Sequence, residues 1–134
     1  LVLVEGAGGL LVRFDDSGAT LADIAWSVHA PVLLVARAGL GARNVTALSA
    51  EALARRGVDS LGVVVGRWPD AAGLAERANL RDLPVDARGP LLGVLPDGMG
   101  ALAAQAFRGA AARSLSPMLG GEFDPQRVLA EHPA

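Results

Sequence analysis

A carboxylate followed by a glycine-rich turn stands near the start of the sequence, in the stretch LVEGAGGLLV at residues 3–12. Glu5 comes where an apolar, strand-like run ends, and the small residues Gly6, Ala7 and Gly8 leave the backbone amides accessible. A carboxylate suits a hard cation such as Mg2+, and open amides suit phosphate oxygens. The same pattern is typical of an exposed turn between two strands. From these residues alone both interpretations stay open.

Three more glycine-containing stretches follow apolar runs: RAGLGARN, GRWPD and LPDGMG. In an open parallel sheet, ligands bind beyond the carboxyl ends of the strands. We therefore expect all four loops to open on one rim of a sheet, where helix N-terminal amides favour anionic groups. Each loop alone is also explained by the preference of short α/β connections for glycine. Together the four indicate a site for a polyphosphate or a nucleotide.

Apolar runs alternate with alanine-rich amphipathic segments, which is the rhythm of a parallel sheet covered by helices. We expect strands at residues 1–4, 32–36, 61–65 and 91–94, local pairing at 10–12, and helices at 20–28, 43–56, 71–83, 101–113 and 125–131. The fold class is therefore α/β, with one domain over residues 1–134. Residues 114–134 are expected to form a loop and a terminal helix.

Several side chains have predicted structural roles. Thr20 and Asp23 have capping-box spacing at the start of the first helix. Trp26 and Phe107 are expected to fill the core. A stripe on the second helix is expected to face the sheet; it consists of Val45, Leu48, Ala52 and Leu53.

Composition excludes several function classes. With 134 residues, 51% of them hydrophobic, the chain can bury one sizeable core. A net charge of −2 gives no electrostatic footprint for nucleic acid or for a membrane surface. The chain has no cysteine, so thiol chemistry and zinc thiolates are excluded, and no lysine, so neither a P-loop lysine nor a Schiff base can form within it. The apolar runs are too short to span a membrane, and a cytoplasmic protein is expected.

The order VEGAGGLLV, PVLLVARAGLGARNVTALSAEAL, LGVVVGRWPD, AN and PLLGVLP resembles the dethiobiotin synthetase family. The resemblance covers about the first hundred residues and is most specific in VEGAGGL and in GLG followed by Asn44 and Thr46. It implies a three-layer, P-loop NTPase-like fold with a mostly parallel sheet. It also implies ATP-dependent closure of the ureido ring of dethiobiotin from diaminononanoate and CO2, with Mg2+, in biotin synthesis.

The resemblance further implies that this chain matches the carboxyl-terminal part of the family, with the N-terminal strands missing. In the family, the phosphate loop with its lysine, a second catalytic lysine and a metal-binding aspartate all precede the strand that opens this sequence. No catalytic residue is therefore expected within these residues. We expect the 134-residue chain alone to have no synthetase activity.

The resemblance also implies roles for individual residues at matching positions. Glu5 matches the family's Mg2+ ligand, and Glu5 to Gly8 (with Gly6 and Ala7) match the stretch that approaches the nucleotide. Gly39, Leu40, Gly41 and Asn44 match the residues that hold the tail carboxylate of the diamine across a dimer interface. Gly66, Arg67, Pro96, Asp97 and Gly98 match the loops beside the base.

The chain also departs from the family. Ala42 and Val45 replace a threonine and a histidine, which removes two hydrogen-bonding groups. Gly66 stands where an asparagine commonly reads adenine, so base preference is expected to be loose and other nucleoside triphosphates are possible cofactors. Arg67 could stack on the base or lie solvated, and Asn44 could instead be a plain helix cap.

Two other functions remain as alternatives. One is another P-loop amide-forming ligase, such as an enzyme of cobyrinic acid amidation. The other is a non-catalytic dimerisation remnant of a ParA-like ATPase. The partners expected in the main interpretation are the small-molecule substrates and a second copy of the chain, with no nucleic acid and no membrane.

Overall fold

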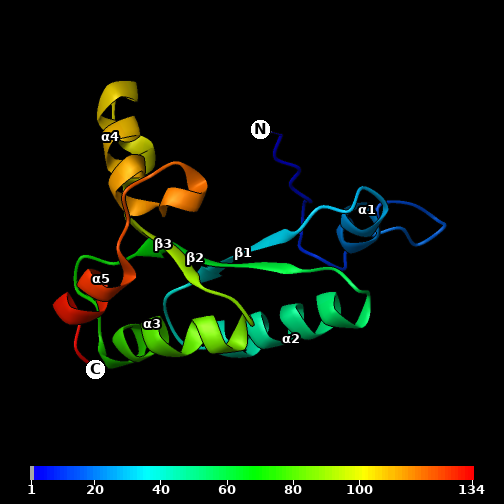
Figure 1. The fold of residues 1–134 in the computed structure, drawn as a ribbon, viewed down its shortest axis with the longest axis horizontal. Coiled ribbons are helices and arrows are strands. Elements are labelled where there is room, and N and C mark those ends of the chain that lie inside the picture. The colour runs from blue at the N-terminus through cyan, green and yellow to red at the C-terminus, as the bar shows by residue number, and fades with distance from the viewer. Residues whose placement is uncertain (1) are drawn as a thin grey trace.

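The computed structural model describes residues 2–134 and has a three-stranded parallel sheet at its centre, with strand order β1-β2-β3. The strands are β1 (Val32–Arg37), β2 (Ser60–Trp68) and β3 (Leu91–Pro96). Helices α2 (Ala42–Arg55) and α3 (Leu74–Asp86) connect them and cover one face of the sheet (Figure 1). The predicted α/β class and the three parallel strands are confirmed.

The remaining helices surround this unit. Helix α1 (Leu21–Ser27) lies to one side, before β1, whereas α4 (Ala104–Ser114) and α5 (Pro125–Glu131) contact β3 (Figure 1). Two short 3-10 helices, η1 (Met99–Ala101) and η2 (Pro117–Leu119), lie in the connections around α4. Within residues 2–134, none of the helices combines the length and the hydropathy that crossing a bilayer would require.

The capping box predicted before α1 is present. The Thr20 N–H donates to Oδ2 of Asp23 at 2.8 Å, and the Thr20 hydroxyl donates to the same oxygen at 2.6 Å. These two bonds hold the carboxylate in its charged form and lower the pKa of Asp23 below its ordinary value. The start of α1 that the spacing predicts is therefore confirmed.

The strand predicted at residues 1–4 is wrong for the part that the structure describes. Residues 2–4 belong to no strand, and the side chains of Val2 and Leu3 are 85% and 83% exposed. An apolar run becomes a strand only where a neighbouring backbone completes its hydrogen bonds, and among residues 2–134 no segment pairs with it. The local pairing predicted at residues 10–12 is also wrong, because these residues lie in a turn and the coil after it.

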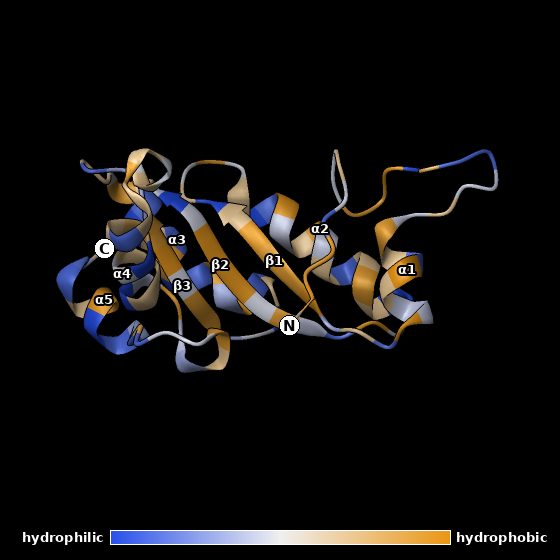
Figure 2. Ribbon diagram, turned by 90° about the horizontal axis from the view of Figure 1, so that it is seen from above, coloured by the Kyte–Doolittle hydropathy of each residue, from blue (hydrophilic) through white to orange (hydrophobic). Residues whose placement is uncertain are grey.

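The core lies between the sheet and the helices α2 and α3. Its largest fully buried side chains are Leu53, Leu80, Leu83, Val63 and Val65. Figure 2 shows the corresponding hydrophobic strands side by side, with the helices around them. This packing fixes the carboxyl ends of the three strands relative to one another.

Two predictions about packing are wrong, the first of them in part. Of the stripe predicted on α2, Leu53 is buried and Ala52 half-buried as expected, whereas Val45 and Leu48 are 57% and 58% exposed. The other buried positions of this helix are Ala42, Thr46 and Ala50. Trp26 and Phe107 do not fill the core, because they are 63% and 43% exposed. The buried aromatic side chains are instead Trp68 and Phe123.

Candidate functional site

Three of the four glycine-containing loops meet at the carboxyl ends of the strands. Arg37 at the end of β1 is in register with Arg67 of β2, and Trp68 of β2 is in register with Pro96 of β3. The N–H of Asp97 donates to the carbonyl of Trp68 at 2.9 Å. The prediction that these loops share one rim is therefore confirmed for the second, third and fourth loops.

An ion pair joins the third and fourth loops. Nη2 of Arg67 lies 2.7 Å from Oδ2 of Asp97, and Oδ1 of the same carboxylate accepts the N–H of Gly98 at 2.7 Å. The guanidinium, and then the Gly98 amide, lower the pKa of Asp97, while the carboxylate raises the pKa of Arg67. The Arg67 side chain is 75% exposed, so solvent screens this pair strongly. Its effect is to orient Arg67 towards the fourth loop.

The glycine at position 66 has a close neighbour on the adjacent strand. A Cβ placed on Gly66 would lie 2.7 Å from Cγ1 of Val35 on the adjacent strand, nearer than Cβ atoms approach other groups. Any side chain at this position would have to displace Val35, including the asparagine that is common there in the dethiobiotin synthetase family. The departure at position 66 therefore has a packing partner within this chain.

The second loop leads directly into the amino end of α2. Gly41 has the left-handed φ of 84° and is the N-cap residue, so the interpretation of Asn44 as the helix cap is wrong. The N–H of Ala42 donates to the carbonyl of Gly39 at 3.2 Å. Across residues 2–134, the N–H groups of Arg43 and Asn44 donate to no backbone carbonyl. An anion at this helix end would find free donors and the positive end of the helix dipole.

The first loop is not tied to the other three. A Cβ placed on Gly6 would lie 3.3 Å from the side chain of Leu21 at the start of α1 and 3.3 Å from Cζ of Phe14. Glu5 is exposed, and within the part of the chain that the structure describes it forms no ion pair and accepts no hydrogen bond. A common rim for all four loops is therefore not observed, because residues 2–4 have no strand partner to fix this turn.

A cation would find few protein ligands among the described residues. Residues 2–134 contain no group of three histidine, aspartate or glutamate side chains able to hold a metal. Glu5 offers one free carboxylate, and Mg2+ is commonly held by one or two carboxylates together with waters and substrate phosphates. Within residues 2–134, a cation near Glu5 would therefore have to take its remaining ligands from water or from a bound substrate.

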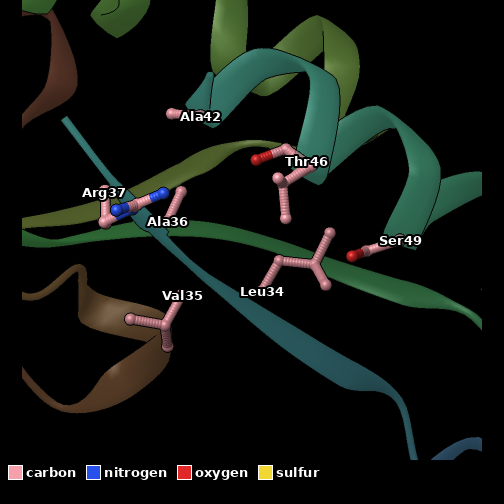
Figure 3. A pocket seen from close by; sticks show the side chains of 8 residues that line it. Leu34, Val35, Ala36, Arg37, Ala42, Thr46 and Ser49 are labelled. Carbon is pink, nitrogen blue, oxygen red and sulfur yellow. The ribbon is translucent and has the colours of Figure 1, made fainter. Parts of the chain in front are cut away.

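A hollow of about 120 Å³ lies between β1 and α2 (Figure 3). Leu34 and Ala36 of the strand face Thr46 and Ala42 of the helix across it. The hollow opens beside β1, whose second edge has no strand partner among residues 2–134. It contains none of the glycines of the predicted site.

Comparison with known proteins places the chain in a family. A family model described as an AAA domain matches residues 1–100. The chain belongs to this AAA domain family.

Three curated relatives of this AAA domain chain share one name. The chain is 59% identical to the ATP-dependent dethiobiotin synthetase BioD of Frankia casuarinae over 98% of its length, which is 56% of that relative. It is 56% identical to the protein of the same name from Streptomyces coelicolor over 92% of the chain and 52% of the relative. It is 60% identical to the protein of the same name from Saccharopolyspora erythraea over 92% of the chain and 54% of the relative. The chain thus spans about half the length of the curated relatives it matches.

Helix α3 of this AAA domain chain makes contacts with the second loop that the sequence does not predict. Nδ2 of Asn79 donates to the carbonyls of Ala38 and Gly39 at 2.6 and 3.1 Å. Ala78 and Asn79 belong to a stretch that resembles the dethiobiotin synthetase family, but no spacing in the sequence predicts which backbone groups Asn79 contacts. The sequence does show that Asn79 is a polar residue next to the buried apolar positions of α3, which indicates that its side chain needs a hydrogen-bond partner in the fold.

Proposed function

We propose that this chain forms part of an ATP-dependent dethiobiotin synthetase. The observation that carries the proposal is the identity of 56–60% with curated relatives of that name over at least 92% of the chain. The meeting of three glycine-containing loops at the carboxyl ends of parallel strands supports it, because that is where an open α/β sheet binds nucleotides.

In the proposed reaction, one amine of diaminononanoate first adds to CO2 and forms a carbamate. The carbamate oxygen takes the γ-phosphoryl group of ATP, and the second amine then attacks the carbonyl carbon and releases phosphate. Such chemistry depends on positioning and on neutralising charge. Bound Mg2+ would supply charge neutralisation between phosphate oxygens, with Glu5 as the ligand from this chain.

The loops have different proposed tasks. The open amides at the start of α2, with Gly39, Gly41 and Asn44, would hold the tail carboxylate of the diamine. The loop from Pro96 to Gly98, linked to the third loop through Arg67, would lie beside the base. We propose a homodimer in which the second copy completes the tail site. A reaction that consumes ATP points to the cytoplasm as its compartment.

The test is product formation. The complete gene product, supplied with diaminononanoate, bicarbonate, ATP and Mg2+, is expected to form dethiobiotin, detected by mass spectrometry, with one phosphate released per ring. The 134-residue chain alone, which has no lysine, is expected to form none. Amide formation that depends on glutamine or ammonia would favour a related ligase instead. Dimerisation without ATP turnover would favour a non-catalytic module.

A further inference from the structure

Helix α3 holds the loop that precedes α2 through one buried side chain. Asn79 is 7% exposed, and its Nδ2 donates to the carbonyl of Ala38 at 2.6 Å and to that of Gly39 at 3.1 Å. Asn79 is 40 residues away from this loop in sequence. These two bonds connect α3 to the tip of β1.

The same loop carbonyl also fixes the start of α2. The oxygen of Gly39 accepts the N–H of Ala42, the first residue of α2, at 3.2 Å in addition to the bond from Asn79. Because both bonds share one peptide group, the Asn79 amide helps to set the orientation of the first turn of α2. The free backbone N–H groups of Arg43 and Asn44 belong to that turn.

Other contacts from α3 leave little freedom around Asn79. One turn earlier, Glu76 accepts the N–H of Gly73 at 2.9 Å, and its second oxygen would lie 3.2 Å from a Cβ placed on Gly39. Further along, Arg43 of α2 forms ion pairs with Asp82 at 2.8 Å and with Asp86 at 2.7 Å. These ion pairs are partly exposed and screened by solvent, whereas the Asn79 bonds are shielded. Asn79 is thus the buried link between α3 and the loop.

From this geometry we propose that Asn79 is a positioning residue for substrate binding. By holding the carbonyls of Ala38 and Gly39, it keeps the free amides at the start of α2 in place for the carboxylate of a bound substrate. Asn79 itself contacts no substrate. The inference rests on the proposed function, which supplies the diamine as that substrate.

The experiment compares two variants of the complete gene product. Asn79→Leu keeps the branched shape and the number of heavy atoms of the side chain but removes both donors. Leu83→Val is the matched control, because it loosens the core packing of the same helix without removing a hydrogen bond to the loop. For Asn79→Leu, the KM for diaminononanoate is expected to rise about tenfold, the range that follows from losing buried hydrogen bonds. The KM for ATP and kcat should change less than about twofold, and the control should leave both KM values unchanged.

Hydrogen exchange gives a second readout that does not need activity. Residues 39–44 should exchange faster in Asn79→Leu than in Leu83→Val. If Asn79→Leu does not fold, Asn79→Ala, which also removes both donors and adds no volume, should show the same selective rise in KM. An unchanged KM for the diamine, or equal rises for both substrates, would overturn the inference alone. Absence of dethiobiotin formation by the unsubstituted protein would instead overturn the proposed function and, with it, the substrate named here.

Discussion

Replacing Gly66 by alanine is expected to destabilise the protein through a clash with Val35. The added Cβ would lie 2.7 Å from Cγ1 of Val35, where ordinary van der Waals contact begins at 3.4 Å. Overpacking of this kind costs about 1–3 kcal/mol. Val35 is 69% exposed and can move towards solvent, which keeps the cost at about 2 kcal/mol rather than at the upper end of that range. Alanine also recovers about 0.5–1 kcal/mol of backbone entropy in a strand, so we expect a net loss of about 1 kcal/mol.

A double-mutant cycle isolates the clash. Val35→Ala alone should change the free energy of unfolding by less than about 0.5 kcal/mol, because the side chain is mostly exposed. In the Val35→Ala background, Gly66→Ala should become neutral or stabilising. The interaction energy between the two substitutions should therefore be about 1–2 kcal/mol.

Urea unfolding followed by tryptophan fluorescence measures each free energy, since Trp68 is buried and follows position 66 closely in sequence. Additive effects of the two substitutions, or an unchanged stability for Gly66→Ala alone, would refute the assignment of Val35 as the group that excludes side chains at position 66. The same cycle bears on function: Gly66→Asn should be tolerated better in the Val35→Ala background than in the otherwise unsubstituted protein.

Three further perturbations have defined outcomes. The carboxyl of Asp97 should titrate below about 3.9, the ordinary value, because Arg67 lowers its pKa; the contribution of the pair to stability is complete above that pH and is lost as the pH falls through the folded pKa. Arg67→Ala should raise the titration midpoint measured by NMR, and an unmoved midpoint would contradict the pairing. Gly62→Ala should lower the free energy of unfolding by about 3 kcal/mol or more, because the added Cβ would lie 2.4 Å from the Pro90 carbonyl oxygen. Gly57→Ala, which has open space around it, should lower it by about 1 kcal/mol. Equal losses for the two variants in urea unfolding would argue against the steric explanation. Glu5→Gln in the complete gene product should raise the Mg2+ concentration for half-maximal activity about tenfold or more, and an unchanged Mg2+ dependence would exclude Glu5 as a ligand.

Local signals in the sequence predict the fold well where the partners of a segment lie within the described chain. The strands that start at Val32 and Leu91 and the terminal helix Pro125–Glu131 follow from apolar runs bounded by glycine or proline. The run at residues 2–4 has the same composition and is no strand, because strand formation depends on a neighbour that local composition does not reveal.

In the candidate site, too, the sequence predicts the positions of the loops but not the contacts between distant side chains. Glycine spacing predicts that the loops after β1, β2 and β3 meet, because the carboxyl ends of parallel strands share one edge. Side-chain contacts between distant segments, such as Asn79 with Ala38 or Val35 over Gly66, depend on packing in three dimensions. On α2, the apolar residues Val45 and Leu48 are exposed while the small residues Ala42 and Ala50 are buried, so the spacing of large apolar residues alone does not predict which face of this helix packs.

The most direct test of the proposed site is a crystal structure of the complete gene product with diaminononanoate, Mg2+ and a non-hydrolysable ATP analogue. We expect the base beside Pro96–Gly98 and Gly66, the Mg2+ within coordination distance of Glu5, and the tail carboxylate on the amides at the start of α2. A nucleotide bound away from the carboxyl ends of β1, β2 and β3, or a diamine without contact to residues 39–44, would contradict the account.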